Sequence, residues 1–247
     1  MECVVDYLDF IEKTNNAETI NELSGCLEWN LKQLGYDHVI YCLLSDHISI
    51  GQSASFAVVS TYPEEWLQYY IEQGYLEVDP VVTMASISST PFNWSDIHKV
   101  ISLNGKEKRV LAEGKAAGLL NGVGVPIHGP KGELAGLGIS SANGVTASDN
   151  TLSLLHSMGQ QFHQSYIKLA TQEPLPKVEQ HDMVLTKRQR EVLSWVSEGK
   201  TNWEIAKILS ITEHGVDYHL RNIFKKLEVN SRITAVSKAF QLGLVQG

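Results

Sequence analysis

A polar stretch with two prolines interrupts the chain and constrains its fold more than any other feature. Pro174 and Pro176 lie among polar residues that have no sustained periodicity. Proline lacks an N–H donor and its ring collides with the preceding helical turn, so no helix passes through this stretch. We therefore predict two domains, residues 1–170 and 185–247, joined by a linker at 171–184. With 247 residues, of which 43% are hydrophobic, the chain is long enough to bury two cores.

Charge is distributed unevenly between the two predicted domains. Residues 184–247 carry ten Lys and Arg and six Asp and Glu, a balance of +4, although the whole chain has a net charge of -8. Residues 1–183 therefore carry -12. A small basic domain attached to a large acidic one indicates a polyanion as the partner of the small domain. Because many solvated helical surfaces carry a similar excess of basic residues, this balance alone is weak evidence.

The composition disfavours several classes of protein. The first ten residues include Glu2, Asp6 and Asp9, and they have neither the basic nor the apolar region of a signal peptide. No apolar stretch approaches the roughly 20 residues that span a bilayer. The three cysteines show no CxxC spacing and the nine histidines no metal-ligand spacing. We therefore expect a cytoplasmic protein without membrane association, disulfide, metal or cofactor.

The first 170 residues combine strand-like and helical patterns. Short apolar or β-branched runs predict strands at 38–44, 55–60, 122–127 and 134–140, and helical periodicity predicts helices at 20–34, 63–73 and 149–170. Pro63 suits the first turn of a helix, and Ser148 or Asp149 can cap the longest one. Helices that flank the strands indicate an α/β/α sandwich. Together with a helical C-terminal domain, the predicted fold class is α+β.

The C-terminal domain contains only helical patterns. They cover 187–197, 202–209, 213–227 and 231–242, with Thr186, Thr201, Thr212 and Ser231 as N-caps and Gly243 as a stop. The second and third helices are joined by a short turn at Ser210–Ile211, and such a pair can place its second helix in the major groove of DNA. Arg221 and Lys225 share one face of that helix, with Lys226 beside them. These side chains can neutralise phosphates, and Arg can also pair with guanine.

The motifs of this domain resemble the helix-turn-helix of the LuxR/FixJ family of regulators. They run from Leu185 to Leu193, from Gly199 to Ala206 and from Val216 to Leu227. The alternative is an unrelated four-helix domain with a basic face. The resemblance implies binding to duplex DNA, and the DNA-binding residues that it implies are Lys200, Thr201, Thr212, His214, Asp217, Tyr218, Arg221, Lys225 and Lys226.

Three positions depart from the family pattern. Gly215 replaces a β-branched residue or Ser, and glycine costs roughly 1 kcal/mol inside a helix. Asp217 replaces a basic or polar residue that faces the bases. An acid repels phosphates but accepts a hydrogen bond from the cytosine amino group, so we expect an altered base preference, with weakened DNA binding as the alternative. Gln189 replaces a Glu that is linked to polymerase contact, which weakens the expectation that the chain contacts RNA polymerase as an activator.

An aromatic ladder is the main feature of the N-terminal domain. Tyr62, Trp66 and Tyr70 fall on one helical face, Asp79 follows them, and Trp94 lies further along the chain. Tyr and Trp combine apolar rings with polar atoms, so this face can enclose an apolar ligand and give it directed hydrogen bonds. A carboxylate among them needs a donor, such as a ligand amide N–H. The alternative is an ordinary aromatic core in which Asp79 caps the next helix, and spacing alone favours that alternative.

Further motifs of this domain favour a ligand site. Tyr62–Trp66, Asp79–Val81, Pro91–Trp94, Gly118–Gly122 and Pro126–Gly129 resemble the autoinducer-binding domain of LuxR-type quorum-sensing receptors. With the C-terminal motifs, the resemblance covers nearly the whole chain. It implies a sandwich of helices about an antiparallel sheet that encloses an N-acyl homoserine lactone as the effector.

The resemblance also implies the role of each polar group. The indole N–H of Trp66 donates to the lactone carbonyl, Asp79 accepts from the ligand amide N–H, and Tyr62 donates to the acyl carbonyl. Tyr70 and Trp94 form walls around the lactone.

The strands provide the remaining residues of this implied site. Ile40, Cys42 and Phe56 line the acyl channel. Gly138 stands where many relatives carry a Ser or Thr that supports the amide end of the ligand, so we expect a lost hydrogen bond and added volume. Ser140 faces the same side as Gly138 only if the strand is regular.

Three functions follow from these observations. The first is a ligand-responsive LuxR-type regulator, and the second is a regulator of the same fold that works without ligand or as a repressor. The third, a lactone-processing enzyme, is disfavoured because the sequence has neither Gly-x-Ser-x-Gly nor a metal-binding histidine motif. For the first we expect ligand to complete the core of residues 1–170. We also expect a homodimer through the helices at 149–170 and 231–242, and an inverted-repeat operator.

Overall fold

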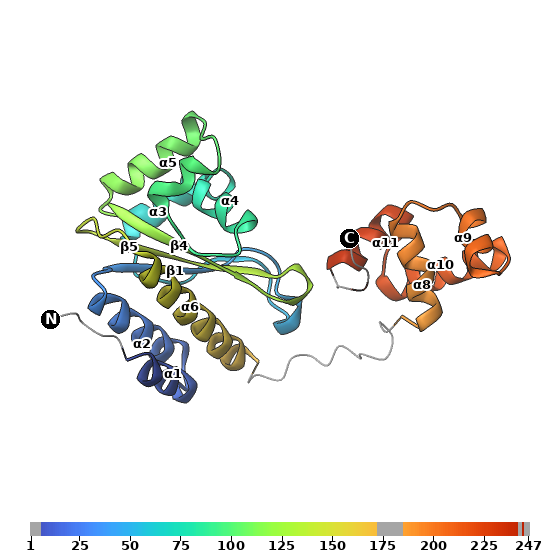
Figure 1. Ribbon diagram of the computed structural model, residues 1–247, viewed down its shortest axis with the longest axis horizontal. Coiled ribbons are helices and arrows are strands. Elements are labelled where there is room, and N and C mark those ends of the chain that lie inside the picture. The colour runs from blue at the N-terminus through green and yellow to red at the C-terminus, as the bar shows by residue number, and fades with distance from the viewer. Residues whose placement is uncertain (1–5, 172–184, 242–243, 245–247) are drawn as a thin grey trace. The chain divides into compact units, whose positions relative to one another are not determined.

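The computed structural model describes residues 6–171, 185–241 and 244, and the chain forms two compact units on either side of residues 172–184. The N-terminal unit contains helices and a sheet, and helices alone form the described part of the C-terminal unit (Figure 1). The predicted α+β fold class is therefore confirmed. Apart from Thr171, the predicted linker at 171–184 lies outside the described residues, as does the predicted stop at Gly243.

A five-stranded antiparallel sheet forms the middle of the N-terminal unit, in the order β2-β1-β5-β4-β3. Its strands are β1 (His38–Leu43), β2 (Ser55–Ser60), β3 (Phe92–Asn93), β4 (Asn121–His128) and β5 (Leu134–Ser141). The four predicted strands are confirmed to within one residue at each end. The two-residue β3 was not predicted, because two residues are too short for an alternating pattern. Gly138 pairs with Ile40 on one side and Gly124 on the other in a regular register, so Ser140 shares its face.

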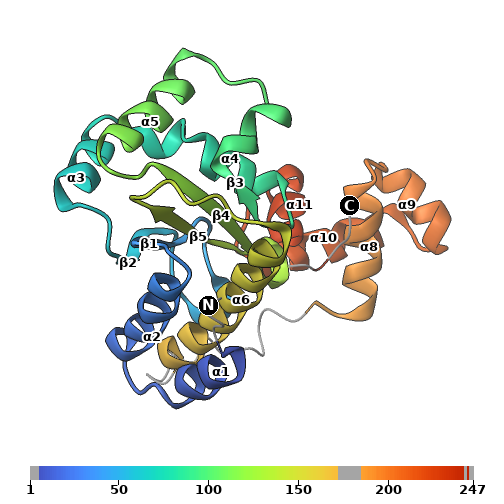
Figure 2. The same ribbon diagram turned by 60° about the vertical axis from the view of Figure 1, so that its left-hand side comes forward.

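Helices cover both faces of this sheet (Figures 1 and 2). One face is covered by α1 (Tyr7–Asn16), α2 (Ile20–Gln33) and α6 (Asp149–Ala170), and the other by α3 (Glu64–Glu72), α4 (Pro80–Ile87) and α5 (Gly105–Ala116). Short 3-10 turns are η1 (Ile48–Ile50), η2 (Tyr75–Glu77), η3 (Trp94–Lys99) and η4 (Pro130–Gly132). The predicted α/β/α sandwich is confirmed, although α3 begins one residue after Pro63 rather than at it.

The main core lies between the sheet and the α1–α2–α6 layer. Leu27 of α2, Val125 and Ile139 of the sheet and Phe162 of α6 are all buried there. Gly159 lets α6 approach the sheet, since a Cβ at that position would lie only 3.0 Å from Val125 Cγ1. Each buried apolar side chain contributes roughly 1.5–3 kcal/mol relative to exposure. This face of the sheet is therefore filled by the protein's own side chains.

A cluster of polar side chains is buried within this core. The Tyr41 hydroxyl lies 2.7 Å from Nδ1 of His163, and the ring of His47 packs edge-on 5.6 Å from that of His163. Close to this cluster in space, Glu133 is buried and accepts hydrogen bonds from the amide and the hydroxyl of Ser49. Burial, followed by the neighbouring His47, lowers the pKa of His163 from 6.5 to about 4. His163 is therefore neutral at pH 7.

The C-terminal unit is built from four described helices, α8 (Lys187–Ser197), α9 (Asn202–Leu209), α10 (Glu213–Leu227) and α11 (Arg232–Gln241). Thr186, Thr201 and Thr212 cap the first three, as predicted. Ile205 of α9 packs with Val216 and Leu220 of α10 in a buried core. The turn between α9 and α10 contains one residue of positive φ, Ser210. The unit is a helix-turn-helix with flanking helices.

The titration of His163 predicts how stability depends on pH. Between pH 6.5 and about 4 the unfolded chain binds a proton at this residue that the folded chain does not, so the free energy of unfolding should fall as the pH falls through this range. The full shift corresponds to on the order of 3 kcal/mol. We expect His163→Gln to reduce this pH dependence in urea-unfolding curves, whereas His156→Gln, a half-buried residue of the same helix, should retain it. Equal pH dependence in wild type and His163→Gln would contradict the assignment.

Candidate functional site

A cavity of about 90 Å³ lies between the second face of the sheet and α3, α4 and α5. Eight of the ten residues predicted for the ligand site line it, namely Ile40, Cys42, Tyr62, Trp66, Tyr70, Asp79, Trp94 and Gly138. The other two, Phe56 and Ser140, do not. Lining residues that the sequence analysis missed include Leu44, Val82 and Val110, whose apolar patterns are indistinguishable from those of ordinary core residues.

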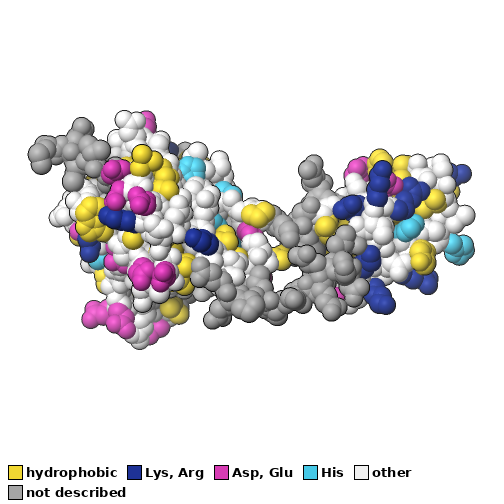
Figure 3. Space-filling view, turned by 90° about the horizontal axis from the view of Figure 1, so that it is seen from below, with side chains coloured by type: hydrophobic (Ala, Val, Ile, Leu, Met, Phe, Trp, Pro, Cys, Tyr) yellow, Lys and Arg dark blue, Asp and Glu magenta, His cyan; other side chains and the backbone are white. Residues whose placement is uncertain are grey.

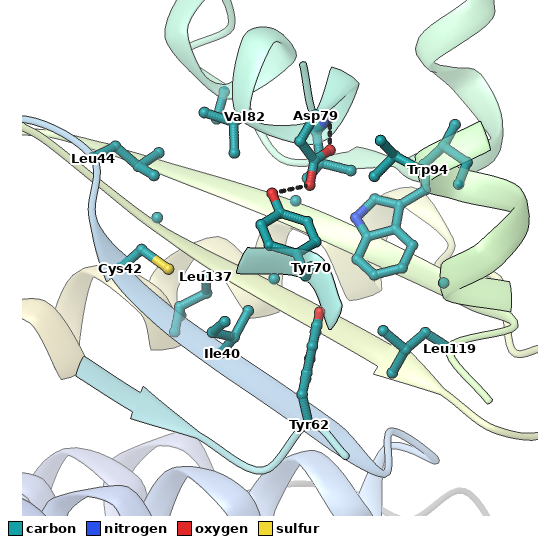
Figure 4. A pocket seen from close by; sticks show the side chains of 18 of the residues that line it. Ile40, Cys42, Leu44, Tyr62, Tyr70, Asp79, Val82, Trp94, Leu119 and Leu137 are labelled. Atoms are coloured by element: carbon teal, nitrogen blue, oxygen red, sulfur yellow. Dashed lines mark hydrogen bonds between the residues drawn. The ribbon is translucent and has the colours of Figure 1, made fainter. Parts of the chain in front are cut away.

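The two ends of the cavity differ in chemistry (Figure 4). Leu44, Cys42 and Val82 lie toward one end, whereas the rings of Tyr62 and Trp94 lie toward the other. Burial raises the pKa of the Cys42 thiol to about 11, so it stays protonated and acts as an apolar wall. The cavity therefore has an apolar end and an end that carries hydrogen-bond donors.

The Asp79 carboxylate is buried but has partners within the protein. Its Oδ1 accepts from the amide of Val81 at 2.7 Å, and its Oδ2 accepts from the hydroxyl of Tyr70 at 2.7 Å. Burial raises the pKa of Asp79, and these hydrogen bonds oppose the rise. The sequence left two alternatives for Asp79, a helix cap or a residue of the ligand site. The structure combines them, because Asp79 caps α4 and also lines the cavity.

Tyr70 and Phe56 pack against each other beside the cavity, and the position of Phe56 differs from the expected one. The two rings stack in parallel, with centroids 5.1 Å apart and planes inclined by 1°. Tyr70 lines the cavity as expected, but its hydroxyl holds Asp79. Phe56 packs in the same cluster without lining the cavity. It supports the Tyr70 ring instead of forming part of an acyl channel.

Gly138 does not add volume, contrary to the sequence expectation. A Cβ at this position would lie 2.9 Å from both Ile40 Cγ2 and the Tyr62 hydroxyl, so these two side chains fill the space. Burial raises the pKa of Tyr62 well above its usual value, which keeps its hydroxyl protonated. Ser140 is fully buried and its hydroxyl has no hydrogen-bond partner. Glycine at 138 therefore allows Tyr62 to come close to the sheet.

Two tryptophans enclose the polar end, each beside a glycine. The Trp66 ring passes 3.3 Å from the position that a Cβ of Gly114 would take. The Trp94 ring lies directly against Gly122, where a Cβ would come within 2.5 Å of the ring. The Nε1 atom of Trp94 is buried without a hydrogen-bond partner. Leaving such a donor unpaired costs about 1–3 kcal/mol.

In this conformation, the cavity is too small for a typical ligand. The 90 Å³ compares with about 30 Å³ for one water molecule and about 300–1,000 Å³ for a typical ligand pocket. An acylated effector enters only if surrounding side chains move. That a ligand completes the core of this unit stays a prediction.

The second candidate site is the exposed face of α10. His214, Tyr218, Arg221 and Lys225 are all exposed and follow each other at helical spacing. Asp217 pairs with Arg221 at 2.6 Å across one turn. Figure 3 shows Lys and Arg side chains over the C-terminal unit and several Asp and Glu side chains on the visible face of the N-terminal unit. Six of the nine residues predicted to bind DNA thus lie on α10.

Four of the predicted DNA-binding residues have structural roles. Thr201 and Thr212 use their hydroxyls to cap α9 and α10. The carbonyl of Lys200 accepts a hydrogen bond from Arg232 of α11. Lys226, expected beside Lys225, donates to Gln189 of α8 at 3.2 Å and so connects α10 to α8.

The departures from the family pattern also have local explanations. Gln189 is buried and forms the capping box of α8 with Thr186, so its replacement of Glu acts on helix structure rather than on an exposed contact. Gly215 lies in the first turn of α10 and its amide donates to Thr212, whereas the sequence analysis placed it in the helix interior. Glycine destabilises a helix less in its first turn than in its interior.

Within the described part of the chain, no cluster of three or more His, Cys, Asp or Glu side chains is placed to hold a metal ion. The search for membrane spans in the same residues finds no helix with the length and apolar character to cross a bilayer.

Comparisons with known proteins agree with this arrangement. Residues 19–166 match the family model of the autoinducer binding domain, and residues 183–239 match that of the bacterial regulatory proteins of the luxR family. The transcriptional activator protein LuxR of Aliivibrio fischeri is 30% identical over 246 residues, which cover 96% of this chain and 92% of that protein. SolR of Ralstonia solanacearum, also a transcriptional activator, is 30% identical over 97% of this chain and 99% of its own length.

A solved structure shows the same architecture over the whole chain. The crystal structure of Escherichia coli SdiA matches with a TM-score of 0.67 and 25% sequence identity, covering 98% of this chain and 100% of that one. Both units therefore have a counterpart in one known protein.

The Tyr70–Asp79 hydrogen bond predicts that removal of the Tyr70 hydroxyl destabilises the protein mainly when Asp79 is present. Tyr70→Phe removes the donor to Oδ2 of a buried carboxylate, and we expect the free energy of unfolding of the ligand-free protein to fall by about 1–3 kcal/mol. In an Asp79→Ala background the same substitution should cost much less, because no carboxylate remains to be satisfied. Urea unfolding of the four proteins of this cycle measures the difference. Equal costs in both backgrounds would assign the effect of Tyr70→Phe to ring packing alone.

Proposed function

Because this chain belongs to the LuxR family of bacterial regulatory proteins, we propose that an N-acyl homoserine lactone in its N-terminal unit controls DNA binding by its C-terminal unit. Its relatives are transcriptional regulators, a class without enzymatic activity, and the enzyme alternative is discarded. An autoinducer-binding domain and a DNA-binding domain make a small molecule and DNA its partners. We further propose that it acts in the cytoplasm with RNA polymerase as an additional partner.

The observation that carries the ligand proposal is the polarity of the cavity. Trp66, Asp79 and Tyr62 all line the cavity, and Tyr62 lies away from the apolar end that Leu44, Cys42 and Val82 form (Figure 4). Such a chamber suits a molecule with a polar head and an acyl tail. In this proposal Trp66 donates to the lactone carbonyl, Asp79 accepts from the amide N–H and Tyr62 donates to the acyl carbonyl.

Binding requires a rearrangement in this proposal. The amide N–H of the ligand reaches Asp79 either beside the Tyr70 hydroxyl or in its place, because that hydroxyl already occupies Oδ2. Tyr62 withdraws from the space above Gly138 to make room for the acyl carbonyl. Hydrogen bonds within the protein are thus replaced by hydrogen bonds to the ligand. The affinity depends on the difference in free energy between the two sets.

A second candidate is regulation without ligand. It is favoured by the small cavity and by the internal satisfaction of Asp79, since both allow the N-terminal unit to fold alone. The two candidates differ in whether stability and operator binding respond to an acyl homoserine lactone.

For DNA recognition we propose a homodimer that binds an inverted repeat. The residues of α6 between Asp149 and Lys168 include no charged side chain, as suits a face covered by a second copy. On α11, Ile233 is 82% exposed, and it offers an apolar contact for the C-terminal units. Two copies of α10 then enter successive major grooves about one helical turn apart.

The ligand proposal predicts a stabilisation that depends on Trp66. Wild type should gain thermal stability from at least one member of a panel of acyl homoserine lactones with short, medium and long tails, by mass action. Trp66→Phe should bind that ligand about tenfold more weakly, because it loses one hydrogen bond. Trp29→Phe, a change at a residue 56% exposed on α2, should behave as wild type. If no lactone stabilises wild type, regulation without ligand is the better description.

The Asp217–Arg221 pair predicts opposite effects of two substitutions on DNA binding. Arg221→Ala should weaken binding about tenfold or more and reduce the salt dependence of the binding constant by about one ion. Asp217→Asn should strengthen binding to non-specific DNA, because it frees Arg221 and removes a charge that repels phosphates. Arg109→Ala, which removes an exposed charge from α5, is the control. An unchanged salt slope in Arg221→Ala, measured by fluorescence anisotropy, would show that α10 is not the reading helix.

A further inference from the structure

An unused hydrogen-bond donor faces the cavity. Among the described residues, four buried side-chain polar atoms lack a partner, on Tyr36, His47, Trp94 and Ser140. Of these residues, Trp94 alone lines the cavity. Its indole nitrogen points toward the side on which Asp79 and Tyr70 lie (Figure 4). This donor is not required by the hydrogen bonding of the protein itself.

The backbone holds the indole in this orientation. Asn93, the preceding residue, exchanges two hydrogen bonds with the backbone of Ala147, its Oδ1 accepting at 3.0 Å and its Nδ2 donating at 3.1 Å. The ring lies flat on Gly122, which leaves no room for it to move toward the sheet. Trp94 therefore keeps its N–H directed at the cavity.

Among the described residues, no acceptor lies within hydrogen-bond distance of this N–H. Both oxygens of Asp79 already accept hydrogen bonds, from Val81 and Tyr70. Of the side chains toward this end, Leu119 has no acceptor, and no hydrogen bond joins the Tyr62 hydroxyl to the indole (Figure 4). An indole nitrogen is a donor only, so just an acceptor brought into the cavity satisfies it. A water molecule can do so in the free protein, and an apolar ligand atom in the same place cannot.

We propose that the Trp94 N–H donates to an oxygen of the effector's head group, so that the site recognises the head with two indole donors, those of Trp94 and Trp66. This inference rests on the proposed function, because it places the effector in the same cavity. The head group must then offer oxygen acceptors to both indoles, as an ester ring does through a carbonyl oxygen with two lone pairs. A saturated hydrocarbon ring of the same shape leaves both donors unpaired. Trp94 acts as a specificity residue, in addition to its role as an aromatic wall.

The test compares two ligands and two proteins in a cycle. The ligands are the acyl homoserine lactone that binds wild type best and the cyclopentylamide with the same acyl chain, which lacks the ring oxygens. The second protein carries 3-benzothienylalanine at position 94, in which sulfur replaces the indole N–H with little change of shape. We expect this replacement to weaken lactone binding about tenfold and cyclopentylamide binding less than twofold. The same replacement at Trp29 should change neither affinity.

Equal weakening of both ligands, or of neither, would overturn the proposal and leave Trp94 as a wall only. Nuclear magnetic resonance of the labelled indole N–H groups provides a second measurement that needs no variant. The Trp94 resonance should move downfield when lactone binds, and it should move less with the cyclopentylamide. If wild type binds no lactone, the proposed function fails. If wild type and the position-94 variant bind lactone equally, only this inference fails.

Discussion

The burial of one carboxylate organises the upper layer of the N-terminal unit. A buried charge is tolerated only with hydrogen-bond donors around it. Asp79 obtains them from the first turn of α4 and from Tyr70 of α3, so the two helices are held in one relative position. Tyr70 in turn stacks on Phe56 of the edge strand β2. One ionisable group thus links two helices and the sheet around the cavity.

Glycines on the sheet decide how closely the aromatic rings approach it. The rings of Trp94 and Phe92 occupy the positions that side chains at Gly122 and Gly124 would take, and the Tyr62 hydroxyl does so at Gly138. The consequence is a tight chamber, small for an acylated molecule, whose opening depends on the movement of aromatic side chains. Affinity for an effector is then the difference between hydrogen bonds and contacts formed and those given up.

In the C-terminal unit, local hydrogen bonds set the geometry of the reading helix. Threonine caps define where α8, α9 and α10 begin, and Lys226 ties the end of α10 to Gln189 in the first turn of α8. The exposed Asp217–Arg221 pair contributes only a few tenths of a kcal/mol to stability. This ion pair partly neutralises the positive charge of Arg221 before the helix contacts DNA.

The sequence by itself determined the division into two units, four of the five strands to within one residue, the helices of the C-terminal unit and eight of the residues that line the cavity. It did so because hydrophobic periodicity, threonine caps and prolines act locally, and because the motifs resemble a known family. Only the tertiary structure decided what each residue touches. Phe56 supports Tyr70, Asp79 is satisfied within the protein, Gly138 is covered by Tyr62, and Trp94 has an unpaired N–H. These contacts join segments far apart in the chain, and no local pattern encodes the distance between them.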